Sequence, residues 1–467
     1  MERNRQLIVV ANRLPVRRVT ERGQRRWVTS PGGLVSALAP VMANSPNALW
    51  IGWAGATGTA PEPFEHDGLQ LHPVSLSRAE VQQYYEGFSN ATLWPLYHDA
   101  IAAPEYHRTW WDDYVTVNRR FAETVVDRAE EGALVWVHDY QLQLVPGLLR
   151  ELRPDLRIGF FLHIPFPARE IFLRLPWRTE LVDALLGADL LGFQTEVMAH
   201  NFRHLVPRVT ARDSVELRGE TVLLGERSVE TRTCPIGIDH TRFGDAALLE
   251  ETTTEVEKLR QQLDQPRTVL LGVDRLDYTK GIERRLQAFG ELLDEDRLSS
   301  DDVVLIQIAE PSRSNVNGYS EIRAAVERTV GEINGNFGSM TRPAIHYLHR
   351  SHDFRELTAL YRLADVMLVT PFRDGMNLVA KEYVATRYDH TGTLVLSESA
   401  GAAHELHEAV LVNPYDTEGL KDAIETAVFM PAQERARRME PMRDTVCTAN
   451  ALRWATEFLE GLQGEIS

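Results

Sequence analysis

The sequence predicts an α/β protein built from two doubly wound parallel sheets, and three observations lead to that class. Short apolar runs alternate with amphipathic stretches along the 467 residues, which is the pattern of parallel strands flanked by helices. A chain of this length exceeds one ordinary hydrophobic core, so two or three domains are expected. Many of the apolar runs end in polar or charged residues, at the edge where doubly wound sheets bind ligands.

The strand candidates form two sets separated by a polar stretch. The first set comprises residues 6–14, 48–55, 69–76, 133–140, 157–164, 190–195 and 231–238, and the second comprises 268–276, 303–312, 344–350, 366–372, 393–398 and 409–414. Residues 239–266 between the sets are predicted to form a polar helical bridge. We therefore expect a Rossmann-like domain over residues 1–240, a second over 241–442, and a helical tail over 443–467.

Composition and charge exclude several classes of protein. The hydrophobic fraction of 43% and the charged fraction of 25% are typical of soluble globular domains, and no apolar run is long enough to span a membrane. Cys234 and Cys447 are too few for a disulfide framework or a cysteine-built metal site, which favours the cytoplasm. The net charge of −17 argues against a nucleic-acid partner. The arginine-rich stretch 17–26 is interpreted as a solvated loop, and a homo-oligomer is compatible with the sequence.

The segment GVDRLDYTKG (272–281) predicts a diphosphate site. A strand runs into Asp274, and Arg275 and Lys280 follow, five residues apart around a turn closed by Gly281. Two cations at the mouth of a strand suit a diphosphate, because arginine supplies forked donors and lysine a point charge. The alternative is a surface turn with structural salt bridges.

The segment PFRDGMNLVAKEY (371–383) predicts a second part of the same site. A helix is expected from Met376 onward, and a phosphate oxygen can be held without metal by its first backbone N–H groups, those of Met376, Asn377 and Leu378. Glu382, one helical turn further on, can accept ribose hydroxyls, and Asp374 can accept sugar hydroxyls. Asp374 is also expected to act as the N-cap of this helix, and the two roles are compatible.

Three strand ends in the N-terminal half carry polar side chains. Arg13 ends the first strand. Asp139 lies at the C-terminal end of the strand predicted in 133–140, and His163 at that of the strand predicted in 157–164. A buried histidine with satisfied hydrogen bonds is the usual alternative for His163. The convergence of several such strand ends favours ligand binding.

Glycine and aromatic residues complete the candidates of this half. The pair Gly32-Gly33 precedes a helix and permits close approach of a ligand to the backbone. Residues 83–98 are rich in aromatic side chains, among which Trp94 and Tyr85 are the ligand candidates because sugar faces stack on aromatic rings. The others are expected to be core residues, namely Tyr84, Phe88 and Tyr97.

The sequence resembles the trehalose-6-phosphate synthases in nine motifs that follow one another in the same order: NRLPV, SPGGLVSAL, FSNATLWP, WVHDYQLQLVP, FLHIPFP, GFQTE, GVDRLDYTKGI, FRDGMNLVAKEY and LSESAGAAHEL. The similarity covers roughly Leu7 to Asn413. It implies a GT-B fold with the active site in the cleft between two Rossmann-like domains. It also implies a retaining transfer of glucose from UDP-glucose to glucose 6-phosphate that requires no cofactor or metal. ADP-glucose and GDP-glucose stay open as donors.

Carried over position by position, the resemblance implies a role for each candidate. Residues 1–240 would bind the acceptor, residues 241–442 the nucleotide sugar, and the tail would pack back on the first domain. On the donor side it implies Arg275 and Lys280 for the diphosphate, Glu382 for the ribose, Asp374 and His163 for the transferred glucose, and Gly33 for the phosphate approach. On the acceptor side it implies Arg13, Arg313 and Tyr85 for the sugar phosphate, and Trp94 and Asp139 for the sugar ring.

Two rival functions are weighed against this expectation. One is a related transferase with another phosphorylated acceptor, such as glycerol 3-phosphate. The other is a catalytically silent sensor of sugar phosphates. The sensor is disfavoured because all four cations, Arg13, Arg275, Lys280 and Arg313, are present.

Overall fold

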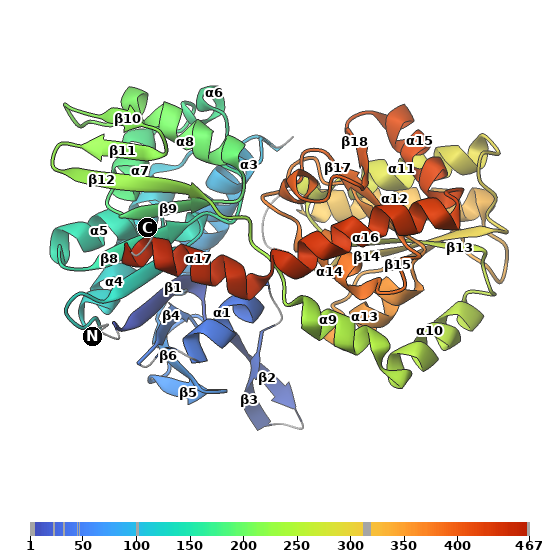
Figure 1. Cartoon of the computed structure of the whole chain (residues 1–467), viewed down its shortest axis with the longest axis horizontal. Helices are drawn as coiled ribbons and strands as arrows, with labels where there is room; N and C mark the ends of the chain where they lie inside the picture. Colours follow the sequence, from blue (N-terminus) through green and yellow to red (C-terminus); the bar gives the residue numbers. More distant parts are fainter. Residues whose placement is uncertain are drawn as a thin grey trace. The chain divides into compact units, whose positions relative to one another are not determined.

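The computed structural model describes residues 5–21, 24–30, 33–43, 45, 47–99, 102–311 and 319–464, which divide into two compact units (Figure 1). Unit 1 contains the described residues of Met1–Asp99, Ala103–Ile236 and Ala451–Ser467. Unit 2 contains those of Ala100–Ala102 and Gly237–Asn450. The chain thus enters unit 2 at Gly237 and leaves it after Asn450, whereas the sequence placed these boundaries at residues 240 and 442.

Within the described residues, unit 1 is organised around a ten-stranded sheet in the order β10-β11-β12-β9-β8-β7-β1-β4-β6-β5. Its parallel strands are β1 (Leu7–Arg13), β4 (Leu49–Trp53), β6 (Leu69–Val74), β7 (Leu134–His138), β8 (Arg157–Phe161), β9 (Leu190–Phe193) and β12 (Arg227–Thr233). The strands that pair antiparallel are β5 (Phe64–His66) at one edge, and β10 (Glu216–Arg218) and β11 (Thr221–Leu224) towards the other. The strand order reverses between β1 and β7, which makes their carboxyl ends the expected ligand edge.

The helices of unit 1 connect these strands. They are α1 (Gly33–Ala43), α2 (Arg78–Glu80), the π-helix η1 (Val81–Leu93), α3 (Trp94–Tyr97), α4 (Arg108–Val126), η2 (Tyr140–Leu142), α5 (Val145–Leu152), α6 (Arg169–Phe172), α7 (Arg178–Leu185), α8 (Glu196–Val209) and α17 (Ala451–Gln463). Helix α17, drawn in red in Figure 1, packs against β8, β9 and α1. Phe458 of α17 lies so close to Gly159 and Gly192 that a Cβ at either glycine would come within 2.7 Å of its ring. Glycine at these positions lets the helix sit directly on the sheet.

The stretch 17–26 was predicted to be a loop, and that prediction was wrong for its described residues, 17–21 and 24–26, which lie in two paired strands. Strands β2 (Val16–Glu21) and β3 (Gln24–Thr29) pair antiparallel. The Arg18 guanidinium lies 4.8 Å from the centroid of the Trp27 ring, and that ring stacks on Phe64 at 5.0 Å. Cation–π and aromatic contacts therefore organise residues whose charge alone suggested a solvated loop.

The described part of unit 2 contains a six-stranded, wholly parallel sheet in the order β15-β14-β13-β16-β17-β18. The strands are β13 (Thr268–Arg275), β14 (Val303–Glu310), β15 (Ile345–Leu348), β16 (Val366–Val369), β17 (Thr393–Ser397) and β18 (Val410–Val412). This is the 3-2-1-4-5-6 order of a Rossmann sheet, and its switch point lies between β13 and β16. Each of the thirteen strands predicted from the sequence overlaps a strand of the two large sheets.

The helices of unit 2 are α9 (His240–Leu248), α10 (Glu250–Gln262), η3 (Tyr278–Lys280), α11 (Ile282–Asp294), α12 (Tyr319–Phe337), α13 (Phe354–Leu363), α14 (Leu378–Thr386), η4 (Gly401–His404), α15 (Thr417–Val428) and α16 (Ala432–Thr448). The stretch 239–266, predicted to be a helical bridge, forms α9 and α10, which pack on α13 within this unit. The helical tail is divided, because α16 belongs to unit 2 and α17 to unit 1.

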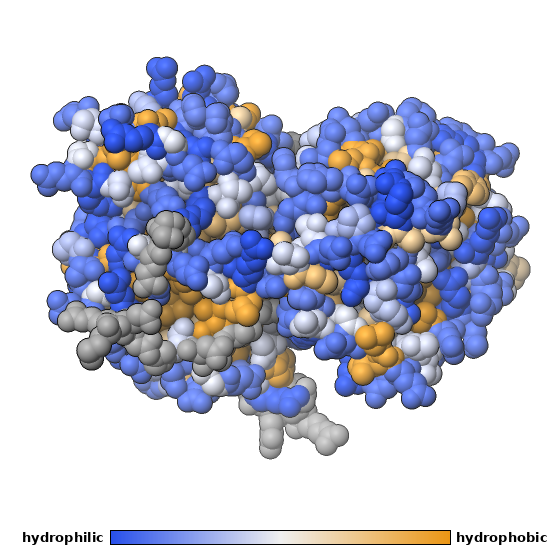
Figure 2. Space-filling view, viewed as in Figure 1, coloured by the Kyte–Doolittle hydropathy of each residue, from blue (hydrophilic) through white to orange (hydrophobic). Residues whose placement is uncertain are grey.

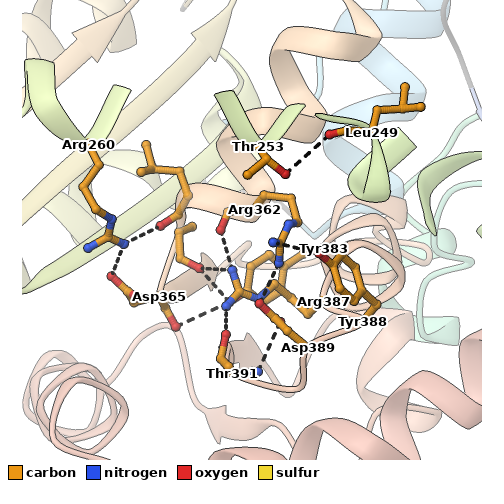
Figure 3. Close-up of polar contacts among 12 residues, drawn as sticks. Leu249, Thr253, Arg260, Arg362, Asp365, Tyr383, Arg387, Tyr388, Asp389 and Thr391 are labelled. Carbon is orange, nitrogen blue, oxygen red and sulfur yellow. Dashed lines mark hydrogen bonds and ion pairs between the residues drawn. The ribbon is translucent and has the colours of Figure 1, made fainter. Parts of the chain in front are cut away.

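A buried arginine, Arg387, binds the backbone just before β16, at the end of the strand opposite the switch-point edge (Figure 3). Arg387 is 3% exposed and donates to the carbonyl oxygens of Arg362 at 2.6 Å and Ala364 at 3.1 Å. Arg260 of α10 reaches the Asp365 carboxylate at 3.2 Å, and that carboxylate also accepts from a backbone N–H of β13. These contacts join α10, α13 and α14 to the sheet.

Hydrophilic residues dominate the face drawn in Figure 2, in keeping with a charged fraction of 25%. Among the helices that the structure describes, none has the length and apolar character needed to cross a membrane.

Candidate active-site residues

The turn after β13 is held against the loop after β16. Gly281 has φ 64°, and a Cβ there would lie 2.3 Å from the carbonyl oxygen of Thr370. The N–H of Phe372 donates to the carbonyl of Thr279 at 2.8 Å. Only glycine combines this backbone conformation with this approach, so Gly281 brings Lys280 beside the loop that carries the second candidate segment.

Lys280 and Asp374 form an ion pair. The Lys280 side chain is 9% exposed, and its Nζ lies 2.5 Å from Oδ2 of Asp374. The same oxygen accepts a hydrogen bond from Nδ2 of Asn377 at 3.1 Å. The expectation that Asp374 caps the helix was wrong. Asn377 is the N-cap, because its Oδ1 accepts from the N–H of Ala380 at 3.3 Å while its own backbone is left-handed at φ 77°.

Helix α14 begins at Leu378, two residues later than the sequence predicted. Met376 lies before it, is 3% exposed, and accepts the N–H of Ala402 on its carbonyl at 2.8 Å. The N–H groups of the first helical turn have no acceptor within the helix, so the turn keeps the anion-binding character of a helix N-terminus.

Neighbouring residues at the end of β13 have different environments. Arg275 is exposed, whereas Asp274 is 6% exposed and pairs with the fully buried Arg285 of α11. Arg285 also donates to the carbonyl of Leu368 in β16 at 2.5 Å. The Asp274–Arg285 pair therefore joins the two strands of the switch point, whereas Arg275 lies on the exposed side of this strand end.

Glu382 is oriented by a buried tyrosine. The hydroxyl of Tyr361, which is fully buried, donates to Oε2 of Glu382 at 2.9 Å. Burial raises the pKa of Glu382, and the Tyr361 hydrogen bond opposes that shift. The carboxyl group is thus poised to accept further donors, such as the hydroxyls of a ribose.

In unit 1, the side chains of Arg13 and Tyr85 both contact the ring of Trp53. The Arg13 guanidinium lies 4.4 Å from the ring centroid of Trp53, and Tyr85 meets Trp53 edge-on at 6.0 Å. Trp53 ends β4 and is 5% exposed, whereas Arg13 is exposed at the end of β1. Within the described residues no carboxylate pairs with Arg13. Its charge is therefore available to an anion.

Asp139 has a strained backbone. It follows β7 with φ 73° and ψ 171°, a region that is essentially restricted to glycine. Its Oδ1 accepts the backbone N–H of His163 at 3.2 Å, and its own N–H donates to Phe161 at 2.8 Å. Such strain persists where the surroundings hold it, and it is concentrated at functional sites.

His163 is paired with a second histidine. Its Nε2 lies 3.1 Å from Nδ1 of His138, the last residue of β7. Burial lowers the pKa of His163 to about 3, and burial together with His163 lowers the pKa of His138 well below its usual range. Both imidazoles are therefore neutral near pH 7.

The remaining candidates of unit 1 differ in exposure. Trp94 is 4% exposed. Its ring centroid lies 4.1 Å from that of His98 and 5.7 Å from that of Tyr140. Gly33 is the first residue of α1. Arg313 lies outside the described residues. The expectation of a core position is confirmed for three aromatic residues that are fully buried, namely Tyr84, Phe88 and Tyr97.

The structure adds three residues that the sequence did not single out as ligand or positioning groups, namely Trp53, His138 and Tyr361. Trp53 lies near the end of the predicted strand 48–55 and ends the observed β4, close to the edge that carries the polar candidates, and that position was a usable signal. His138 stands next to Asp139 at a polar strand end, but its contact with His163 depends on the register of β7 and β8, which the local sequence does not display. Tyr361 lies in the last turn of α13, where nothing in the local sequence points to Glu382.

Comparison with known proteins identifies the family. The model of glycosyltransferase family 20 matches residues 5–464. A trehalose-6-phosphate synthase of Mycolicibacterium smegmatis is 54% identical over 463 residues, which cover 97% of this chain and 92% of the relative.

Solved structures give the same result. An α,α-trehalose-phosphate synthase (UDP-forming) from Burkholderia xenovorans, in complex with glucose-6-phosphate, is similar with a TM-score of 0.89 and 35% identity over 98% of this chain and 100% of that one. An E. coli structure bound with UDP-2-fluoro glucose has a TM-score of 0.90 and 34% identity over 98% of each chain. With its two Rossmann-like units, this chain has the GT-B fold and belongs to glycosyltransferase family 20.

Proposed function

We propose that this glycosyltransferase moves glucose from UDP-glucose to glucose 6-phosphate with retention of configuration, giving α,α-trehalose 6-phosphate and UDP. The observation that carries the proposal is the cluster of Lys280, Asp374 and Asn377 at the switch point of unit 2. The cluster brings a lysine, a carboxylate and a helix N-terminus side by side, and these groups suit a diphosphate and sugar hydroxyls. The relatives bound to glucose-6-phosphate and to UDP-2-fluoro glucose support both substrates.

On the donor side, Arg275 and Lys280 would neutralise the diphosphate together with the backbone N–H groups at Met376, Asn377 and Leu378. Glu382, oriented by Tyr361, would accept the ribose hydroxyls. Two cations and a helix N-terminus match the charge of a diphosphate, so we propose that the transfer proceeds without a metal ion. Gly33, at the start of α1, would let the donor phosphate approach the backbone.

On the acceptor side, Arg13 would bind the phosphate of glucose 6-phosphate, with Arg313 and the hydroxyl of Tyr85. Trp53 holds the Arg13 guanidinium in place. Asp139 and Trp94 are proposed for the sugar ring. Of the two, the half-buried carboxylate of Asp139 can accept a sugar hydroxyl, whereas Trp94, at 4% exposure, offers little of its ring.

The proposed chemistry is a front-face displacement. The bond between the glucose anomeric carbon and the diphosphate breaks while the acceptor hydroxyl attacks from the same side, and a diphosphate oxygen takes the hydroxyl proton. Asp374 and His163 would hold the transferred glucose. Arg275 and Lys280 would stabilise the charge that develops on the leaving diphosphate, which is an electrostatic role that needs no nucleophilic carboxylate.

The test combines the purified protein with glucose 6-phosphate and, separately, with UDP-, ADP- and GDP-glucose, each with and without a chelator. Nucleoside diphosphate release and the sugar product are followed together. Trehalose 6-phosphate formed from UDP-glucose in chelator supports the proposal, and glucose or glycerol 3-phosphate as acceptor should react poorly. Absence of transfer with every donor and acceptor, with binding retained, would leave the sensor as the function.

Variants separate the diphosphate role from general loss of structure. Arg275→Ala and Lys280→Ala should each lose about 2.7–4 kcal/mol of transition-state stabilisation, the effect of removing one donor from an oxyanion site. Lys258→Ala is the matched control, because Lys258 is exposed on α10 and pairs only with Glu255 within the described chain. Near-normal turnover in both active-site variants would reject the assignment.

A further inference from the structure

We propose that His138 is a positioning residue for His163: its Nδ1–H donates to Nε2 of His163 and thereby holds His163 in the tautomer that presents Nδ1–H to a sugar hydroxyl. The inference rests on the proposed function, in which His163 contacts the transferred glucose. It adds the identity of the donor atom and the residue that selects it.

The two histidines come from neighbouring parallel strands. His138 ends β7 and is in register with Phe161, the last residue of β8, two positions before His163. The ring nitrogens are 3.1 Å apart, and the rings are inclined at 28° with centroids 5.4 Å apart. This is a hydrogen bond between side chains that the sheet register brings together.

Aromatic residues enclose the pair. His138 is fully buried, and its ring lies 4.8 Å from Trp136 and 6.4 Å from Trp454 of α17. The ring of Trp454 also lies 6.1 Å from His163. The helix that returns to unit 1 therefore covers the histidine pair and excludes water from its inner side.

Burial decides which nitrogen carries the proton. Nε2 of His138 is buried and has no hydrogen-bond partner among the described residues. If His163 were the donor, neutral His138 would carry its proton on Nε2 and would bury an N–H without an oxygen or nitrogen acceptor. Aromatic rings are weak acceptors, and a buried N–H left unpaired is costly. His138 is therefore the donor through Nδ1–H.

The consequence for His163 follows directly. Since Nε2 of a neutral His163 accepts a hydrogen bond, its proton is on Nδ1. Within the described chain His163 makes no second side-chain hydrogen bond, and the residue is only partly buried. His163 thus acts as a hydrogen-bond donor to substrate, and a sugar oxygen placed there must accept.

Two nearly isosteric variants separate this role from packing. His138→Asn keeps an N–H close to the position of Nδ1, whereas His138→Leu removes it. Two-dimensional ¹⁵N NMR of the imidazoles reports the tautomer directly, and His163→Gln assigns the His163 signals. Thermal unfolding of each variant checks that the fold is retained.

We expect the Nδ1–H tautomer of His163 in the wild type and in His138→Asn, and a mixture of tautomers in His138→Leu. The Leu variant should lose roughly tenfold in kcat with little change in the KM for glucose 6-phosphate, and the Asn variant should recover most of that loss. An Nε2–H tautomer in the wild type, or equal kcat in the Asn and Leu variants, overturns the inference. The Nδ1–H tautomer without any glucosyl transfer supports the histidine assignment and rejects the proposed function.

Discussion

Nζ of Lys280 lies 2.5 Å from Oδ2 of Asp374, although 94 residues separate them in the sequence. The side chains are 9% and 15% exposed, so little water screens the pair. The cation proposed for the diphosphate is thus already compensated by the carboxylate proposed for the sugar. If Lys280 binds the diphosphate as proposed, the diphosphate would share it with Asp374, and binding of the two parts of the donor would be coupled energetically.

Substitution of Asp374 by Asn should change UDP binding and transfer in opposite directions. Removal of the carboxylate leaves Lys280 fully available, so the affinity for UDP should rise roughly tenfold, while kcat falls on the order of a hundredfold because a sugar-hydroxyl acceptor is lost. Titration calorimetry with UDP and steady-state kinetics measure the two effects. Asp422→Asn on α15, whose side chain is 70% exposed, is the control. Weaker UDP binding with unchanged kcat would contradict the prediction.

Replacement of Arg13 by Leu should raise the KM for glucose 6-phosphate about 10- to 100-fold, the effect of losing a charge-assisted hydrogen bond. The ratio of kcat/KM for glucose 6-phosphate to kcat/KM for glucose should fall by the same factor. Steady-state kinetics with both acceptors measures it, with Arg17→Leu on the exposed side of β2 as the control. A variant that keeps the wild-type preference for the phosphorylated acceptor would exclude Arg13 from the phosphate site.

The ribose role of Glu382 can be tested with a modified donor. Glu382→Ala should lose the preference for UDP-glucose over its 2′-deoxyuridine analogue, because the acceptor of the ribose hydroxyl is gone. Tyr361→Phe removes only the hydrogen bond that orients Glu382, so it should raise the donor KM by roughly threefold to tenfold and leave the acceptor KM unchanged. Equal discrimination against the deoxy donor in wild type and Glu382→Ala would disprove the role.

The histidine pair should make the protein sensitive to acid. Since the folded-state pKa of His163 is about 3 and the unfolded value is near 6.5, the unfolded chain binds a proton first as the pH falls. Stability is therefore lost below about pH 6.5, at about 1.4 kcal/mol per pH unit for this group. Between about pH 7 and pH 5, the free energy of unfolding of His163→Gln should fall by about 2 kcal/mol less than that of the wild type. Denaturant unfolding at both pH values measures this, with His200→Gln on α8 as the control.

Loss of the buried arginine in Figure 3 should destabilise unit 2 without a direct effect on substrate binding. Arg387→Met removes the donor to the carbonyl oxygen of Arg362 and the ion pair with Asp389, while the carbonyl oxygen of Ala364 keeps the hydrogen bond from Tyr383. We expect a loss of about 1–3 kcal/mol of unfolding free energy, because buried hydrogen bonds to backbone carbonyl groups are lost, while Asp389 keeps its ion pair with Arg362. The KM values, measured at temperatures below the variant's thermal unfolding midpoint, should stay close to those of the wild type. A free energy of unfolding equal to that of the wild type would refute the prediction.

The local sequence determined the secondary structure of both sheets and the type of residue at their ligand edges. Continuous apolar runs such as 268–276 are typical of strands buried on both faces, and polar residues at their ends mark the edge where ligands bind. The resemblance of nine ordered motifs determined the family. These signals are local in the chain, so a sequence displays them directly.

The tertiary structure decided which of these side chains are in contact, because each contact joins segments that are distant in the sequence. Lys280 pairs with Asp374 since a glycine lets the β13 turn touch the loop after β16, and His138 reaches His163 through the register of β7 and β8. Arginines expected in a loop form a hairpin because Trp27 supplies an aromatic face to Arg18. Side-chain partners and the atoms that carry protons depend on such contacts, and no local pattern encodes them.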